Sequence, residues 1–232
     1  MGTDELPRLP ADPQALWALA HRNPLRGVRS AGDAYRLHEA TVAFPGNFIR
    51  VFKNRIRLPN GFETQHEIVM PHAAVSIVAV LEETPGRPEI ILVEQFRSTV
   101  EGFIHEIPAG VMDQREEPLA CARRELLEET GYGADRWTPM ATIYPTPGFA
   151  LERMHFFLAE GLHVAGSQNL DPGECIQVKR VALEPLIGSL LTGIPAPGIP
   201  GIVDGKTWIG ILYLAARRGF AGAATHPKET ER

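Results

Sequence analysis

The chain has 232 residues, of which 44% are hydrophobic and 22% are charged, an ordinary globular composition with enough apolar material for a real core. Its formal net charge of −5 argues against a nucleic-acid partner, since a basic surface is what attracts polyanions. Two cysteines exclude a disulfide framework and fit a reducing, cytoplasmic setting, and the lack of a signal peptide or a membrane-length apolar run predicts a soluble protein without a membrane partner.

The first third of the chain contains short alternating runs of polar and apolar residues. After a predicted short helix at 15–22, strands are expected at 35–44, 47–58 and 62–70. The last two are separated by Asn60-Gly61, a dipeptide that strongly favours a tight hairpin turn. Residues 1–66 are therefore expected to form an N-terminal segment with a small antiparallel β unit.

The rest of the chain mixes short strands with about three helices. Strands are predicted at 73–83, 88–97, 103–110, 137–145, 153–162 and 176–183, and helices at 118–130, 184–193 and 204–218. This pattern indicates an α/β fold in which helices cover a mixed sheet. We expect it to form one domain over residues 67–220, followed by a disordered tail at 221–232.

The helix predicted at 118–130 concentrates acidic side chains. Pro118 suits its first position and Gly131 its C-terminal cap. Positions three and four apart share a helix face, so Glu125, Glu128 and Glu129 form one cluster close to the negative end of the helix dipole. The cluster is either a solvated face or a site for a divalent cation, which prefers carboxylate oxygens.

The surrounding stretch decides between these alternatives. The sequence GVMDQREEPLACARRELLEETGY, which begins at Gly110, matches the Nudix box at every defined position. The chain thus resembles the Nudix hydrolases, which cleave a nucleoside diphosphate linked to another moiety. This resemblance implies an α/β/α sandwich, a pyrophosphatase activity and a Mg²⁺ cofactor, with Mn²⁺ as a possible substitute.

The resemblance also assigns roles within the box. Glu125 and Glu129 correspond to metal ligands, and Glu128 to a third ligand or a close neighbour. Arg124 corresponds to the residue that orients a box glutamate through a charge-assisted hydrogen bond, with Glu116 as its partner or as an outer-shell ligand. The residues of this stretch that are expected to take part in catalysis are therefore Arg124, Glu125, Glu128 and Glu129.

Flanking motifs resemble those of the ADP-ribose pyrophosphatase group. HEIPAGVMD implies that Glu106 and the carbonyl of Ala109 bind metal or substrate, and VEQFR implies a phosphate or ribose contact for Arg97. Pro147 stands 15 residues beyond the box, where that group carries a proline. DGKTWIGILYLA is similar to the C-terminal helix of the same enzymes.

The resemblance places the general base in a loop that follows a later strand. Here the loop GSQNLDPGECIQ offers Glu174, with Asp171 nearby, and Glu152 is an alternative. The expected activity is Mg²⁺-dependent hydrolysis of ADP-ribose or a related nucleoside diphosphate sugar by a homodimer. The alternatives are hydrolysis of GDP-mannose, a dinucleoside polyphosphate, coenzyme A or an oxidised nucleotide, and a non-catalytic sensor of nucleotide sugars.

Overall fold

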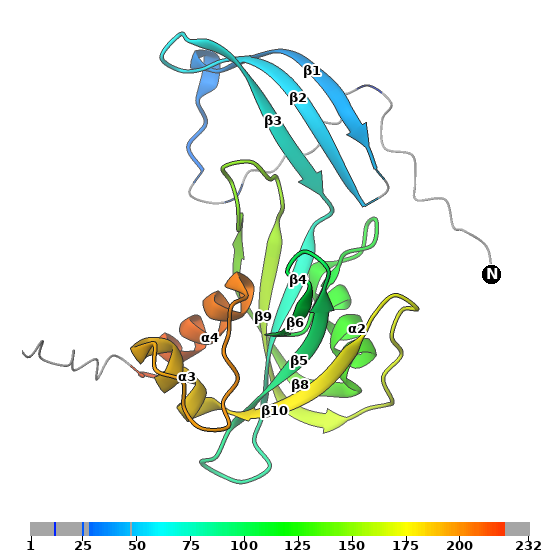
Figure 1. Ribbon diagram of the computed structural model, residues 1–232, viewed down its shortest axis with the longest axis vertical. Helices are drawn as coiled ribbons and strands as arrows, with labels where there is room; N and C mark the ends of the chain where they lie inside the picture. The colour runs from blue at the N-terminus through cyan, green and yellow to red at the C-terminus, as the bar shows by residue number, and fades with distance from the viewer. Residues whose placement is uncertain (1–11, 13–24, 26–27, 47, 221–232) are drawn as a thin grey trace, which may run out of the picture. The chain divides into compact units, whose positions relative to one another are not determined.

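A computed structural model describes residues 12, 25, 28–46 and 48–220 (Figure 1). The predicted helix at 15–22 and the predicted disordered tail at 221–232 lie outside the described residues. Contacts divide the chain into two compact units. The first contains the residues up to Ala74 together with Val111–Glu116 and Thr142–Met154, and the second contains Val75–Gly110, Glu117–Ala141 and the residues from His155 onward.

The first unit contains a three-stranded antiparallel sheet in the order β1-β2-β3. Its strands are β1 (Arg36–Pro45), β2 (Ile49–Arg57) and β3 (Glu63–Pro71), and η1 (Gly32–Ala34) precedes them. Asn60-Gly61 forms the turn between β2 and β3, with Gly61 at a φ of 85° that glycine adopts without strain. Alternate residues of the strands form a small core around Ala40 and Phe52. The predicted N-terminal β unit is thus confirmed.

The second unit supplies most of a seven-stranded sheet in the order β10-β5-β4-β9-β8, to which β6 and β7 are added at β5 and β4. The strands are β4 (Ala74–Leu81), β5 (Glu89–Arg97), β6 (Gly102–Glu106), β7 (Ala109–Val111), β8 (Tyr132–Ile143), β9 (Met154–Val164) and β10 (Ile176–Ala182). Every residue of β4 is buried, because helices cover both faces of the sheet.

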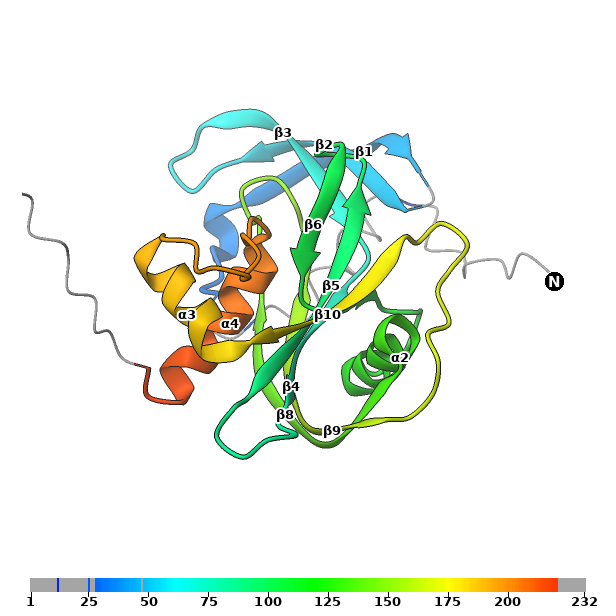
Figure 2. The same ribbon diagram turned by 60° about the horizontal axis from the view of Figure 1, so that its bottom comes forward.

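The helices form the two outer layers. Figure 2 shows α2 (Pro118–Thr130) on one face of the sheet, and α3 (Leu183–Thr192) and α4 (Gly205–Arg217) on the other. The predicted α/β/α sandwich is confirmed. In the described part of the chain, no helix combines the length and the apolar character needed to cross a membrane.

One predicted strand is divided in two. Residues 103–110 were expected to form one strand closed by Pro108 and Gly110, but β6 ends at Glu106 and a further strand, β7, begins at Ala109. Pro108 has no N–H to donate to a sheet, and its carbonyl instead accepts a hydrogen bond of 2.8 Å from the amide of Ile77. The break lets the chain leave β5 and continue beside β4, and it leaves the amides of Ile107 and Ala109 to donate to side chains outside the sheet.

Candidate active site

The acidic helix α2 faces inward rather than toward solvent. Glu125 is 9% exposed and Glu129 only 3%, whereas Glu128 lies on the more open flank. Gly131 closes the helix in the left-handed conformation, with its amide bonded to the carbonyl of Leu127. A solvated helix face is excluded for Glu125 and Glu129.

The box carboxylates are bound to the protein's own donors. Nη1 of Arg124 donates to Glu125 at 2.8 Å and to Glu128 at 2.9 Å, so one guanidinium orients two box glutamates. Glu129 accepts a hydrogen bond of 3.0 Å from the amide of Ala109. Glu129, a predicted metal ligand, thus contacts Ala109, whose carbonyl oxygen is another predicted ligand.

Burial disfavours the ionised forms of Glu125 and Glu129. Desolvation raises the pKa of Glu129 to about 8, although the amide of Ala109 opposes the shift, and the charges of Glu125 and Glu174 add to it. Desolvation also raises the pKa of Glu125, against the opposing charge of Arg124. The candidate base Glu174 therefore lies near enough to both box acids to interact with them electrostatically.

The donor set fits a divalent cation. Buried carboxylates whose ionised form is disfavoured gain most from a hard cation, because it neutralises their charge through oxygen ligands. Among the residues that the structure describes, no three His, Cys, Asp or Glu side chains already converge on one point. The residues that would hold the cation are Glu125, Glu128, Glu129 and the carbonyl of Ala109.

A glycine is required where the loop meets the helix. A Cβ atom added at Gly110 would lie 1.9 Å from the Cδ atom of Glu125. Close approach, rather than an unusual backbone angle, is therefore the reason for glycine at the first position of the box.

We expect Gly110→Ala to lower kcat/KM about 100-fold, because it displaces the Glu125 carboxylate from its place in the site. Steady-state kinetics would measure the loss. Gly188→Ala is the matched control, since a Cβ at Gly188 meets nothing within 4 Å and the residue lies within α3. The explanation is wrong if the two variants retain the same activity.

A second group of charges lies beside this loop. Arg97 donates to both oxygens of Glu106, through Nε at 2.7 Å and Nη2 at 2.8 Å. Lys206 of α4 also bonds Glu106, which is 2% exposed. Burial alone would raise the pKa of Glu106, but the bonds from Arg97 and the charge of Lys206 lower it below its usual value. Arg97 and Glu106, both predicted to bind substrate, are thus joined to each other.

The loop that carries Glu174 is fixed to the end of α2. The side-chain amide of Gln168 donates to the carbonyl of Glu129 at 2.6 Å, and the amide of Asn169 donates to the carbonyl of Glu128 at 2.9 Å. These bonds satisfy carbonyls that a helix end leaves free. Glu174 itself accepts a hydrogen bond from the amide of Asp171 within the loop. Gln168 was not predicted from the sequence.

Pro147 and Glu152 belong to the first unit. Pro147 is exposed in a turn in which the amides of Phe149 and Ala150 bond the carbonyl of Thr146. The turn is joined to β3, because the amide of Val69 donates to the carbonyl of Phe149. The predicted substrate contact of Pro147 and the alternative base Glu152 stay predictions.

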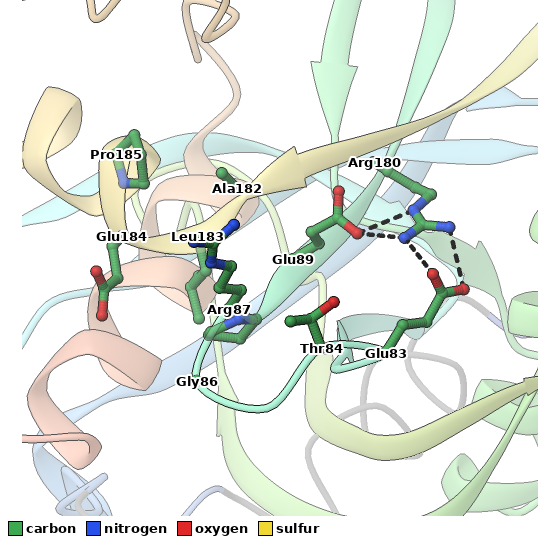
Figure 3. Close-up of a pocket in the computed structure, with 11 residues that line it drawn as sticks. Glu83, Thr84, Gly86, Arg87, Glu89, Arg180, Ala182, Leu183, Glu184 and Pro185 are labelled. Carbon is green, nitrogen blue, oxygen red and sulfur yellow. Dashed lines mark hydrogen bonds and ion pairs between the residues drawn. The ribbon is translucent and has the colours of Figure 1, made fainter.

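A pocket at the opposite end of β5 has a different character (Figure 3). It contains Glu89, the first residue of β5, roughly 26 Å along the strand from Arg97 at about 3.3 Å per residue. Its Arg180 is ion-paired with both Glu83 and Glu89. The positive charge of Arg180 is therefore already neutralised within a pocket that is also lined by Arg87 and Glu184.

Comparison with known proteins identifies the family. The model of the NUDIX domain matches residues 70–199. The chain belongs to the Nudix family. This Nudix hydrolase is 43% identical over 189 residues to an ADP-ribose pyrophosphatase of Bacillus subtilis (strain 168), covering 79% of this chain and 96% of that protein. The family prediction from the box is confirmed.

Two further similarities extend the comparison. A methanol dehydrogenase activator of Bacillus methanolicus is 33% identical over 172 residues, which cover 74% of this chain and 87% of that protein. The crystal structure of an ADP compounds hydrolase superposes with a TM-score of 0.67 at 19% identity, over 81% of this chain and 96% of the other. At that identity the structural likeness shows the fold alone.

Proposed function

We propose that this Nudix hydrolase cleaves the pyrophosphate bond of ADP-ribose or a related nucleoside diphosphate sugar. ADP-ribose would give AMP and ribose 5-phosphate. The observation that carries the proposal is the pair of buried acids on α2, Glu125 and Glu129, set beside the Arg97–Glu106–Lys206 charges. The choice of sugar nucleotide is supported by the similarity to the Bacillus subtilis enzyme over nearly its whole length.

The arrangement supports an attack by water on a phosphorus atom. A Mg²⁺ ion, or Mn²⁺ in its place, would neutralise pyrophosphate oxygens and acidify a bound water. Glu125, Glu129, Glu128 and the Ala109 carbonyl would hold it, with Arg124 fixing two of these carboxylates. Arg97 has one guanidinium nitrogen, Nη1, outside its bonds to Glu106, and this nitrogen would contact a phosphate oxygen.

The proton of the attacking water needs an acceptor. Glu174 is the proposed base, because its charge acts on both Glu125 and Glu129 and its loop is bonded to the end of α2. One P–O bond would form to the water oxygen, and the bridging P–O bond would break. The second phosphate would leave with the electrons of that bond.

A substrate panel tests the proposal. Wild-type protein with Mg²⁺ is incubated with ADP-ribose, GDP-mannose, a diadenosine polyphosphate, coenzyme A and an oxidised nucleoside triphosphate, and products are separated by chromatography. We expect kcat/KM for ADP-ribose to exceed that for each of the other substrates at least about tenfold, a difference of about 1.4 kcal/mol in transition-state binding. Preference for GDP-mannose, the diadenosine polyphosphate, coenzyme A or the oxidised nucleotide would contradict the proposal, and binding without turnover would indicate a sensor.

We also propose that residues 1–66 serve homodimerisation, that residues 67–220 form the catalytic domain, and that the enzyme works in the cytoplasm. The first unit exposes the large aromatic side chains of Phe44, Phe48 and Phe62, at 53%, 66% and 64%. Exposed aromatic residues are enriched in protein interfaces. Light scattering on the full chain would test the dimer, and a monomer at micromolar concentration would contradict it.

A further inference from the structure

The start of helix α4 contacts the loop between β6 and β7. Asp204 caps the helix, since its carboxylate accepts from the amide of Thr207 at 2.9 Å and from its hydroxyl at 2.6 Å. The hydroxyl of Thr207, which is fully buried, accepts in turn from the amide of Ile107 at 2.8 Å. A residue of α4 thus satisfies a backbone group of the active-site loop from 100 positions away.

Lys206 completes this contact. Its ammonium group bonds Glu106 and lies 3.1 Å from Asp204, and its side chain is only 12% exposed. Arg97 and Lys206 provide two positive charges, and Glu106 and Asp204 provide two negative charges. The four side chains therefore form a neutral group in which Lys206 is the one link between α4 and Glu106 among the described contacts.

The loop is held from both ends. Glu106 and Ile107 are bound by α4, through Lys206 and Thr207, and Ala109 is bound by α2, through Glu129. Glu106 and Ala109 are only three residues apart in the sequence, and consecutive Cα atoms are 3.8 Å apart. A shift of Glu106 away from α4 would therefore move Ala109 relative to Glu129.

Helix α4 also fits closely against the loop. A Cβ added at Gly210 would lie 2.8 Å from Val78 and 3.0 Å from Ile107, so the helix backbone approaches both side chains. The position of α4 is thus fixed by packing, and its charged first turn is presented to the loop at a defined place.

We infer that Lys206 is a positioning residue of the active site: it holds Glu106, and through Glu106 it sets the guanidinium of Arg97 and the place of Ala109 beside Glu129. Lys206 contacts no reacting atom in this arrangement and acts through its neighbours. The inference rests on the proposed function for the role of Arg97 toward substrate. Its consequence for Ala109 and Glu129 concerns metal binding and needs no substrate.

The test measures Mn²⁺ affinity by electron paramagnetic resonance titration of the full chain, in parallel with kcat and KM. For Lys206→Met we expect the Mn²⁺ Kd to rise about tenfold and kcat/KM to fall 10- to 100-fold, the usual range when a residue behind a metal ligand is removed. Lys206→Arg, which restores a cation for Glu106, should recover most of both losses. If Lys206→Met does not fold, Lys206→Gln takes its place with the same expected losses, since its neutral side chain also removes the cation beside Glu106.

Lys179→Met is the matched control. Lys179 forms an ion pair of 3.1 Å with Glu94 on the same sheet, so its loss removes a lysine–glutamate pair outside the site. Each variant is measured well below its melting temperature. The inference would be overturned if Lys206→Met had the same Mn²⁺ affinity and the same kcat/KM as the Lys179→Met control. A wild type that leaves ADP-ribose intact while Mn²⁺ affinity depends on Lys206 would refute the substrate proposal and support the positioning role.

Discussion

Replacing Glu129 by glutamine is expected to lower kcat at least about 1,000-fold while leaving the metal-free protein as stable as the wild type or more so. The amide keeps the shape of the side chain and can still accept from the amide of Ala109. It removes a negative charge that burial disfavours and that a cation needs. Loss of a metal-binding carboxylate removes the charge stabilisation that the cation supplies to the transition state.

The two halves of this prediction distinguish catalysis from structure. A residue needed only for folding would lose stability and activity together, whereas Glu129→Gln should lose activity alone. Steady-state kinetics with Mg²⁺ and thermal unfolding without metal measure the two effects. Glu117→Gln is the control, because Glu117 is exposed at the N-terminus of the same helix and makes no side-chain capping bond. Equal activity in the two variants would refute the role of Glu129.

The same residue predicts how stability depends on pH in the metal-free protein. The pKa of Glu129 is raised from 4.5 to about 8 in the fold, so between these values the folded chain binds a proton that the unfolded chain has released. The contribution of Glu129 to the free energy of unfolding therefore falls as pH rises from about 4.5 to about 8, and this contribution changes no further above that. Urea titrations across this range should show the fall in the wild type and a smaller one in Glu129→Gln.

Local signals in the sequence were sufficient for the helix that is proposed to carry the chemistry. Pro118 and Gly131 mark its two ends, and the structure begins and closes α2 at these residues. Spacing of three and four places Glu125 and Glu129 on one face, and the continuous apolar run of β4 indicates a strand covered on both sides. Each of these features depends only on residues that are close together in the sequence.

Such local signals could not predict contacts between segments that are far apart in the sequence. The pairing of β7 with β4 after Pro108 joins segments that are far apart in the sequence, and the neutralisation of Glu106 depends on Lys206. Lys206 stands in a stretch whose similarity to a C-terminal helix was recognised, but nothing in its local sequence indicates which carboxylate it meets. Gln168 likewise becomes informative only when its loop is placed against the end of α2. Long-range pairing, rather than propensity, determines these positions.

The Arg97–Glu106–Lys206 group provides the second large prediction. We expect Glu106→Ala to lower the free energy of unfolding by about 3 kcal/mol, because it removes the buried carboxylate that both cations contact and leaves the 12% exposed Lys206 beside the 40% exposed Arg97. Asp204 cannot compensate both, since it already caps α4 and lies beside Lys206. Urea denaturation of the metal-free chain would measure the loss, with the slope of the transition checked for a change in the unfolded state.

Glu160→Ala provides the matched comparison, because Glu160 forms an ion pair of 3.3 Å with Arg218 in which both side chains are more than a quarter exposed. Solvent screens such a pair, so its loss should cost less than about 1 kcal/mol. The contrast between the two glutamates separates burial from charge pairing as the source of stability. If Glu106→Ala cost no more than Glu160→Ala, water or a local shift would have to relieve the two cations, and the rigid loop that the positioning of Ala109 requires would not exist.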